Sequence, residues 1–270
     1  MSKFNRYQLF IVVLFFVLIQ IGCKKETKKQ EEEGGKLKIQ FTHTVDSLQL
    51  FKNQMIYYNA AGNQYEISEV KYFISDLVLY NNNKSQVLIN KWTAIHYIDI
   101  DYPNTLIWDI YDEIPSGKYD SISFIFGLNE NRNISYQFVN PPEVNMFWPE
   151  ILGGGYHYLM INGKWKSPNN QINPFNFHLG IGQIYTGNVV NTDSIIGHVH
   201  NYFKVTLPTP NLYINKGITS SLKLNMNINS WFCTPHIYDH NYWGGNIMQN
   251  QAAMNTAKEN GFDVFGVVEN

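Results

Sequence analysis

The 270-residue chain has little cysteine and little net charge. Its two cysteines, Cys23 and Cys233, are too few for a disulfide scaffold or for the common structural zinc sites, which use two to four thiolates held close together. Its 20 Lys and Arg residues are balanced by 22 Asp and Glu residues. Because sequence-independent binding to nucleic acid depends on clustered basic residues, nucleic acid is not an expected partner.

Aromatic residues, in contrast, are plentiful. Tyr, Phe and Trp make up 15% of the chain, and the formal net charge is −2. Disordered chains have the opposite composition, with few aromatics and a high net charge. The chain is therefore expected to fold around a sizeable hydrophobic core.

The amino end has the pattern of a secretory signal. Lys3 and Arg6 precede an apolar run at residues 9–19. The run is shorter than the about 20 apolar residues of a membrane-spanning helix, and its length is typical of the apolar part of a signal peptide.

Cys23 directly follows Gly22. This ending resembles a bacterial lipobox, although Gln20 stands where Leu is usual, and the resemblance implies cleavage before Cys23 and lipidation of its thiol. A free cysteine at the end of an ordinary signal is the alternative. Residues 1–22 are thus a predicted lipoprotein signal peptide, and the highly charged residues 23–35 are a predicted flexible tether that holds a domain off a membrane surface.

Residues 36–270 have no further linker, repeat or break in composition, and their dominant hydrophobic period is two. Within residues 36–42 apolar and polar side chains alternate strictly, as in a strand with one buried face. The expected fold is all-β, either a β-sandwich or an irregular β-barrel, with long loops. One short helix is expected near the C-terminus, from Asn246 as N-cap to Asn260, with Gly261 as its stop. Further strands are expected at residues 70–80, 92–100, 119–128, 156–161, 202–207 and 221–229.

The eight histidines are the main candidates for chemistry. His198 and His200 flank Val199, and on a strand side chains two residues apart point to the same face. One metal ion could bind both imidazoles, or both could be exposed polar residues at a strand end. His178 ends an alternating run and His96 lies within one. Taken alone, each fits a hydrogen-bonded, partly buried histidine better than a metal ligand.

Other candidates are weaker. His236 and His240 are four residues apart, a spacing that brings two rings together in a helix, but Gly244 and Gly245 do not continue one. Cys233 could offer a thiolate, and a small buried hydrophobe is the simpler interpretation. The sequence has no Gly-x-Ser-x-Gly elbow and no His-Glu-x-x-His, so its motifs give no indication of a hydrolase.

A series of short motifs occurs in the order typical of one family. The motifs are KYFISDLVL (71–79), HYID (96–99), IPSGKYDSISFIFG (114–127) with Asn133 behind it, MFW (146–148), GY (155–156) and HLG (178–180). With these motifs the chain resembles the MbnP-like copper-binding proteins, in the lipoprotein form common in Bacteroidetes. The resemblance spans roughly residues 36–265. It departs from the family pattern after Trp148, where Pro149-Glu150 and a Gly-rich joint replace a second Trp.

The resemblance implies a secreted β-domain that binds copper, as Cu+ or Cu2+, through histidine. It points to His96 and His178 as ligands and to Trp92 as a modified aromatic, since in relatives a Trp is converted to kynurenine by a dihaem cytochrome c peroxidase partner. Imidazole suits copper, and a sparse site can hold Cu+. His198 and His200 join the candidate metal ligands from their spacing alone.

These observations predict a non-enzymatic lipoprotein that captures or buffers copper at the bacterial cell envelope, anchored by lipid to the periplasmic or surface face of the outer membrane. Two alternatives stay open. One is a surface carbohydrate-binding module whose exposed aromatics stack on sugar rings. The other is an enzyme that works through an open copper site.

Overall fold

The longest described strand, β4 (Gln64–Asn81), is the centre of the larger sheet. The computed structural model describes residues 34–83, 85–91, 94–187 and 190–268. These residues belong to one compact unit, Glu33–Asn270. The predicted signal peptide, most of the predicted tether, Cys23 and Trp92 lie outside the described residues.

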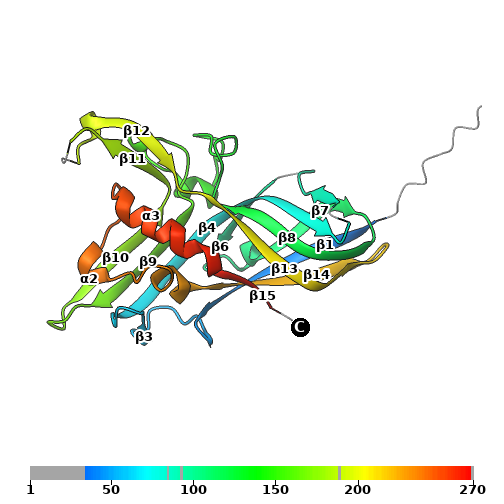
Figure 1. Ribbon diagram of the computed structural model, residues 1–270, viewed down its shortest axis with the longest axis horizontal. Helices are drawn as coiled ribbons and strands as arrows, with labels where there is room; N and C mark the ends of the chain where they lie inside the picture. Colours follow the sequence, from blue (N-terminus) through cyan, green and yellow to red (C-terminus); the bar gives the residue numbers. More distant parts are fainter. Residues whose placement is uncertain (1–33, 84, 92–93, 188–189, 269–270) are drawn as a thin grey trace, which may run out of the picture. The chain divides into compact units, whose positions relative to one another are not determined.

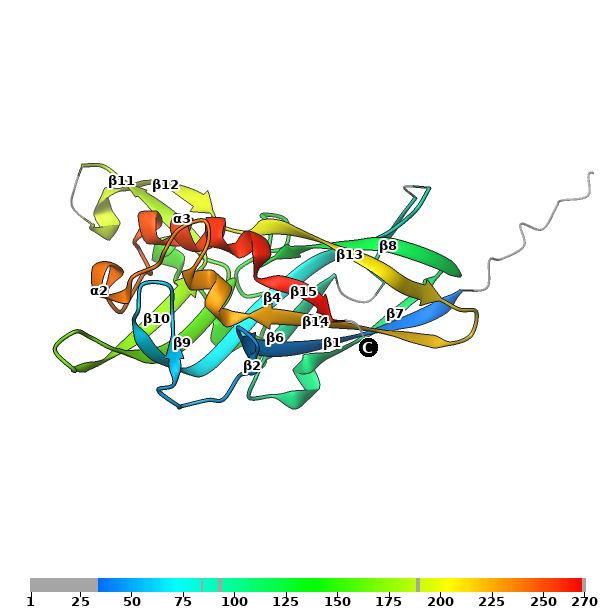
Figure 2. The same cartoon turned by 60° about the horizontal axis from the view of Figure 1, so that its bottom comes forward.

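Two sheets and a separate hairpin make up the fold (Figure 1, Figure 2). The larger sheet has the order β10-β9-β4-β8-β13, and β3, β5 and β6 also pair with β4; the smaller has the order β15-β14-β1-β2, with β7 paired to β1. The hairpin is β11-β12. The remaining elements are β1 (Gly35–Val45), β2 (Leu48–Gln49), β3 (Tyr57–Tyr58), β5 (Gln86–Leu88), β6 (Ile95–Asp99), β7 (Ile107–Ile114), β8 (Gly117–Phe126), β9 (Leu159–Lys166), β10 (Ile172–Leu179), β11 (Ile181–Tyr185), β12 (Ile195–His200), β13 (Phe203–Ile214), β14 (Thr219–Asn227), α2 (His240–Trp243), α3 (Gln251–Asn260) and β15 (Phe265–Val268).

The predicted all-β fold is confirmed, and its form is a sandwich. Neither sheet closes on itself within the described part of the chain. Each predicted strand overlaps an observed strand. In β1 the predicted alternation is observed, because Leu37, Ile39 and Phe41 are buried and the residues between them are more exposed.

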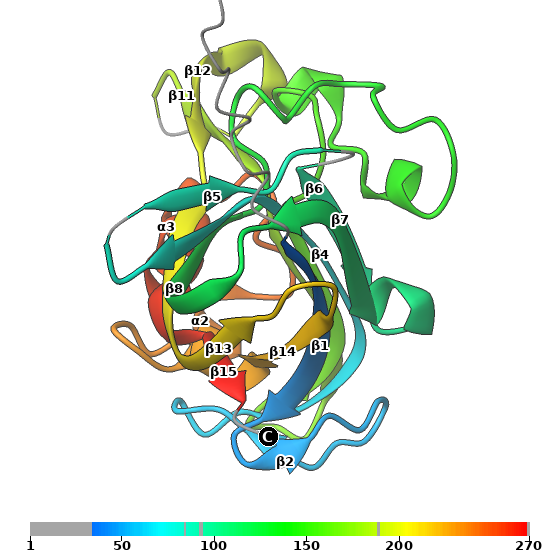
Figure 3. The same ribbon diagram turned by 90° about the vertical axis from the view of Figure 1, so that its right-hand side faces the viewer.

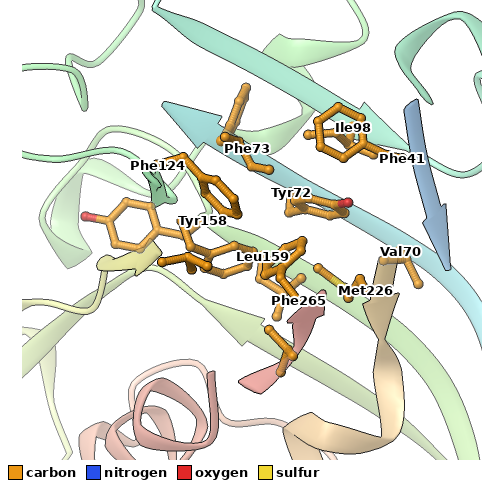
Figure 4. Packing of buried hydrophobic residues seen from close by; sticks show 14 of the residues in the cluster. Phe41, Val70, Tyr72, Phe73, Ile98, Phe124, Tyr158, Leu159, Met226 and Phe265 are labelled. Carbon is orange, nitrogen blue, oxygen red and sulfur yellow. The ribbon is translucent and has the colours of Figure 1, made fainter. Parts of the chain in front are cut away.

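Aromatic rings fill the space between the two sheets. The ring of Phe265, from β15, lies 5.3 Å from Phe124 and 5.9 Å from Tyr72 of the larger sheet, with Met226 in the same cluster (Figure 4). Both ring pairs are edge-to-face, an arrangement worth about 0.5–1.5 kcal/mol per pair beyond the buried area. The sheets are thus joined by ring packing of side chains that alternate inward.

The predicted C-terminal helix is present as α3, and its start differs from the prediction. The N-cap is Asn250, whose Oδ1 accepts from the backbone N–H of Ala253 at 3.1 Å. Asn246, the expected N-cap, instead forms a β-bridge with Asn176. Gly261 follows the helix as expected. No helix among the described residues is long and apolar enough to cross a membrane.

The larger sheet has an inner face on the core and an outer face under a long connection. Tyr72 of β4 is fully buried in the core, whereas Lys71 and Phe73 point the other way, as strand alternation requires. On the outer face Phe73 stacks on Phe138 at 5.4 Å and contacts Tyr156 at 6.2 Å. Residues 127–158, between β8 and β9, therefore cover this face, next to the β11-β12 hairpin (Figure 3).

A bulge in β4 anchors this connection. Asp76 has a left-handed backbone, with φ of 52°, where the register between β4 and β8 shifts. Its carboxylate accepts from Arg132 Nε at 3.0 Å and Nη2 at 2.9 Å, and from Asn129 Nδ2 at 2.6 Å. The first turn of the connection is therefore fixed to the central strand.

His240, the first residue of α2, is fully buried at the end of the larger sheet. Its ring stacks on Phe175 at 4.5 Å and on Trp165 at 5.7 Å. Neither ring nitrogen has a hydrogen-bond partner among the described residues. Burial lowers the pKa of His240 to about 3, against the opposing effect of Asp239.

We predict that His240→Phe makes the protein less sensitive to acid. At pH values between 6.5, the pKa of His240 in the unfolded chain, and about 3, its pKa in the folded protein, His240 is protonated in the unfolded chain and neutral in the folded protein. This group alone therefore lowers the free energy of unfolding by about 1.4 kcal/mol per pH unit as the pH falls through that window. The other titratable groups around the ring are Asp239, Tyr65 and Tyr238, and burial raises the pKa of both tyrosines away from this range.

Urea unfolding of both proteins at pH 7.5, 6 and 5 measures the effect. Phenylalanine leaves no unpaired polar atom between Phe175 and Trp165. The free energy of unfolding of the variant, relative to that of the native protein, should therefore rise as the pH falls. A difference that is the same at all three pH values would contradict the prediction.

Candidate functional site

His178 lies near the end of β10, on the outer face of the larger sheet. Its Nε2 is 2.7 Å from Oδ1 of Asn162. An amide oxygen accepts, so Nε2 of the neutral ring carries the proton and Nδ1 carries the lone pair. Burial lowers the pKa of His178 to about 3, with further lowering by nearby His157 and Lys71, so the ring is neutral at physiological pH.

His157 lies in the segment that leads into β9 and is 6% exposed. Its Nδ1 donates to the carbonyl oxygen of Met146 at 3.0 Å, which leaves the lone pair on Nε2. Burial lowers the pKa of His157 to about 4, although the carbonyls of Met146 and Phe147 act in the opposite direction. This ring is also neutral at physiological pH.

The two rings form a pair. Their centroids are 5.0 Å apart and their planes are nearly perpendicular, at 88°. Bonds from a metal to an imidazole nitrogen are about 2.0–2.1 Å long, so the separation suits one ion bound by a nitrogen of each ring. In the described chain no group of three or more His, Cys, Asp or Glu side chains could hold a metal ion. A metal here would therefore have few protein ligands.

Trp148 forms one wall beside the pair. Its ring is fully buried, lies 4.6 Å from the ring of His157, and donates from Nε1 to the carbonyl of Leu152 at 3.1 Å. A Cβ at Gly180 would lie 2.6 Å from Cε3 of Trp148. The glycine of the HLG motif is thus required by the tryptophan of the MFW motif, which packs on its backbone.

His96, a predicted ligand, occupies a different place. Its ring stacks between Trp108 at 4.9 Å and Phe41 at 5.5 Å, and its Nε2 donates to the carbonyl of Thr105 at 2.8 Å. Tyr97, the next residue on β6, contacts Phe73 on the outer face. His96 therefore points to the face opposite His178, and the two cannot bind one ion together in this arrangement.

His198 and His200 lie on β12, opposite Gln183 and Ile181 of β11. His198 is exposed, and its ring lies against Gly153. His200 is half-buried, with Nε2 3.8 Å from a carboxylate oxygen of Glu130. No contact joins either ring to His178 among the described contacts, so their role as ligands stays a prediction.

The weaker candidates are dispersed. His236 pairs with Glu259 on the surface, whereas the ring of His240 is buried against Phe175, so the two histidines are not brought together. Cys233 is exposed, and its interpretation as a buried hydrophobe was wrong. None of the described tryptophans is exposed, whereas Tyr111, Tyr136 and Tyr242 are, so the carbohydrate-binding alternative stays a prediction.

His157 was not among the predicted site residues. It directly follows the GY motif at 155–156, and its separation of 21 positions from His178 gives no spacing signal. Its position in a motif segment, next in order to MFW, was the signal that could have found it. The tertiary contact between the connection and the outer face cannot be read from local pattern.

The fold and the site together define a β-sandwich protein in which buried His157 contacts half-buried His178 under a long connection. The family model for MbnP matches residues 34–253, and the chain belongs to this family. The predicted resemblance is confirmed. Among solved structures, MbnP from Methylosinus trichosporium is similar to this chain with a TM-score of 0.46 and 13% identity, over 73% of this chain and 77% of that chain. A comparison with curated proteins finds no match.

We predict that Gly180→Ala disturbs the site by displacing Trp148. The added methyl group overlaps the indole ring, and overpacking of this kind costs about 1–3 kcal/mol. Gly266→Ala is the matched control, since a Cβ there meets open space. Urea unfolding followed by tryptophan fluorescence compares them: Gly180→Ala should unfold at lower urea, and equal midpoints for the two variants would refute the packing argument.

Proposed function

We propose that this protein binds copper through Nε2 of His157 and Nδ1 of His178, and that it captures or buffers the metal instead of catalysing a reaction. The observation that carries the proposal is the 5.0 Å ring pair, in which the hydrogen bonds to Met146 and Asn162 leave one lone pair on each ring.

The chemistry of the donor set favours copper. Imidazole is a good ligand for copper, and a site with few ligands suits Cu+, whereas structural zinc is almost always bound by four ligands. Ca2+ and Mg2+ prefer oxygen ligands. Both histidines are already neutral in the folded protein, so no proton has to leave before the metal binds.

The proposed location is the cell envelope. The support is the sequence pattern at residues 1–35, with the predicted lipid on Cys23. A lipid-anchored domain on a charged tether would meet copper outside the cytoplasm. Labelling with a radioactive fatty acid, compared between the native chain and Cys23→Ala, tests the anchor separately from the metal site.

The family resemblance adds an oxidised tryptophan and a dihaem peroxidase partner to the proposal. Trp92 was the predicted position, and Trp148 is the described tryptophan in contact with His157. Peptide mass mapping of protein from its native host distinguishes the two positions. A neighbouring gene that encodes two Cys-x-x-Cys-His haem sites would support the partner.

We predict that His157→Ala and His178→Ala each weaken Cu+ binding at least tenfold, because each removes one of two imidazole ligands. Competition with a coloured Cu+ chelator gives the affinity, and metal analysis gives the stoichiometry. His236→Ala, which changes an exposed surface histidine, is the control and should bind as the native protein does.

His96→Ala and a double change of His198 and His200 to Ala test the other predicted ligands. Copper lost in either of these variants but kept in His157→Ala and His178→Ala would contradict the proposed site. A native protein that stays free of copper under copper challenge would remove the function altogether.

A further inference from the structure

We infer that Asn162 is a positioning residue: it holds the proton of His178 on Nε2, and Glu69 and Lys71 hold Asn162 in the orientation that does so. The tautomer of His178 is a property of the metal-free protein, and only its consequence for copper rests on the proposed function.

The hydrogen bonds define a direction. Asn162 has a donating and an accepting end, and Nδ2 donates to a carboxylate oxygen of Glu69, which can only accept. The amide oxygen of Asn162 therefore faces His178, at 2.7 Å from Nε2. Of the two neutral tautomers of His178, this oxygen selects the one with Nε2–H.

Strand register places the side chains of Glu69, Asn162 and His178 next to one another. Glu69 of β4 is directly opposite Asn162 of β9, and Met160, two residues earlier on β9, is opposite both Lys71 of β4 and His178 of β10. Residues two apart on a strand share a face, so all of these side chains lie on the outer face of the larger sheet. The contacts from β4 to His178 are thus built on paired strands instead of a loop, and Glu69 directly follows a register shift in β4.

Ion pairs with Lys71 hold Glu69 in place. Lys71 forms an ion pair with Glu69 and lies 3.9 Å from Oδ2 of buried Asp99. Asp99 in turn accepts from Tyr97 at 2.8 Å and from the backbone N–H of Asp101 at 2.9 Å. Because Asp99 is itself held and in turn holds Lys71, the carboxylate of Glu69 has a fixed place from which to orient the amide.

The amide of Asn162 leaves His178 neutral, which a carboxylate at the same position would not do. A carboxylate next to His178 would favour the imidazolium, which has no lone pair for a metal. The neutral amide fixes the tautomer without adding a negative charge. Ligating histidines are generally oriented by such a partner, and its loss typically costs 10–100-fold in metal affinity.

The test measures the proton position in metal-free protein. Correlations between carbon-bound protons and ring nitrogens, in protein labelled with 15N-histidine, report which nitrogen of His178 is protonated. The native protein should show Nε2–H. Asn162→Leu should lose this preference, and Glu69→Leu should reverse it, because the freed amide can turn its NH2 toward Nε2. Glu69→Gln keeps an oxygen acceptor and should retain the native tautomer.

The matched control is Asn176→Leu. Asn176 is directly opposite Asn162 on β10, two residues from His178, and is exposed. It should leave both the tautomer and Cu+ affinity unchanged, whereas Asn162→Leu should weaken Cu+ binding 10–100-fold. Glu69→Leu supplies the test if Asn162→Leu does not fold.

A native His178 protonated on Nδ1, or a tautomer unchanged in both leucine variants at Asn162 and Glu69, overturns the inference. If the tautomers change as expected and the native protein binds no copper, the positioning role is supported and the proposed function fails. The two results are therefore distinguishable.

Discussion

The register of β4 against its neighbours is the constraint on which the rest of the structure depends. One face of β4 packs Tyr72 into the aromatic core, and the other presents Glu69 and Lys71 to β9 and β6. Since strand side chains alternate, a slip of one residue would exchange these faces and bury two charges. The core therefore fixes the register, and the register aligns the polar outer face that carries Asn162 and His178. Stability and site geometry are set by the same ladder of backbone hydrogen bonds.

Burial lowers the pKa of most of the described histidines, and His157 and His178 are the two whose rings contact each other. Burial lowers the pKa of His43, His96, His157, His178 and His240. His43 contacts the hydroxyl of Tyr72 and His96 is stacked between two rings, so both serve the core. His157 and His178 differ because they meet each other between the sheet and the connection. Depressed pKa values alone therefore do not distinguish these histidines from the others, and the proposed copper site rests on the contact between the two rings.

Much of the fold could be predicted from the sequence because strand alternation is a local signal. The buried positions of β1 follow directly from the period of two. The start of α3 could not be predicted in the same way, because Asn246 and Asn250 are both good caps and the bridge of Asn246 to Asn176 decides between them. Likewise, the pattern around His96 and His178 places each on a strand, but which face the connection covers depends on pairings between distant segments. His157 was missed for the same reason.

The Gly-rich joint after Trp148, which departs from the family pattern, has a structural purpose. Gly153, Gly154 and Gly155 all have positive φ, and a Cβ at Gly155 would collide with the side chain of Asn133. Asn133 accepts instead from the backbone N–H of Tyr156 at 2.8 Å. The tight joint therefore turns the chain back to the sheet immediately before His157. His178 is placed by strand β10, and His157 is placed by a turn that glycine permits. An insertion or a side chain in this joint would therefore move the ring of His157 away from that of His178 while leaving the sandwich intact.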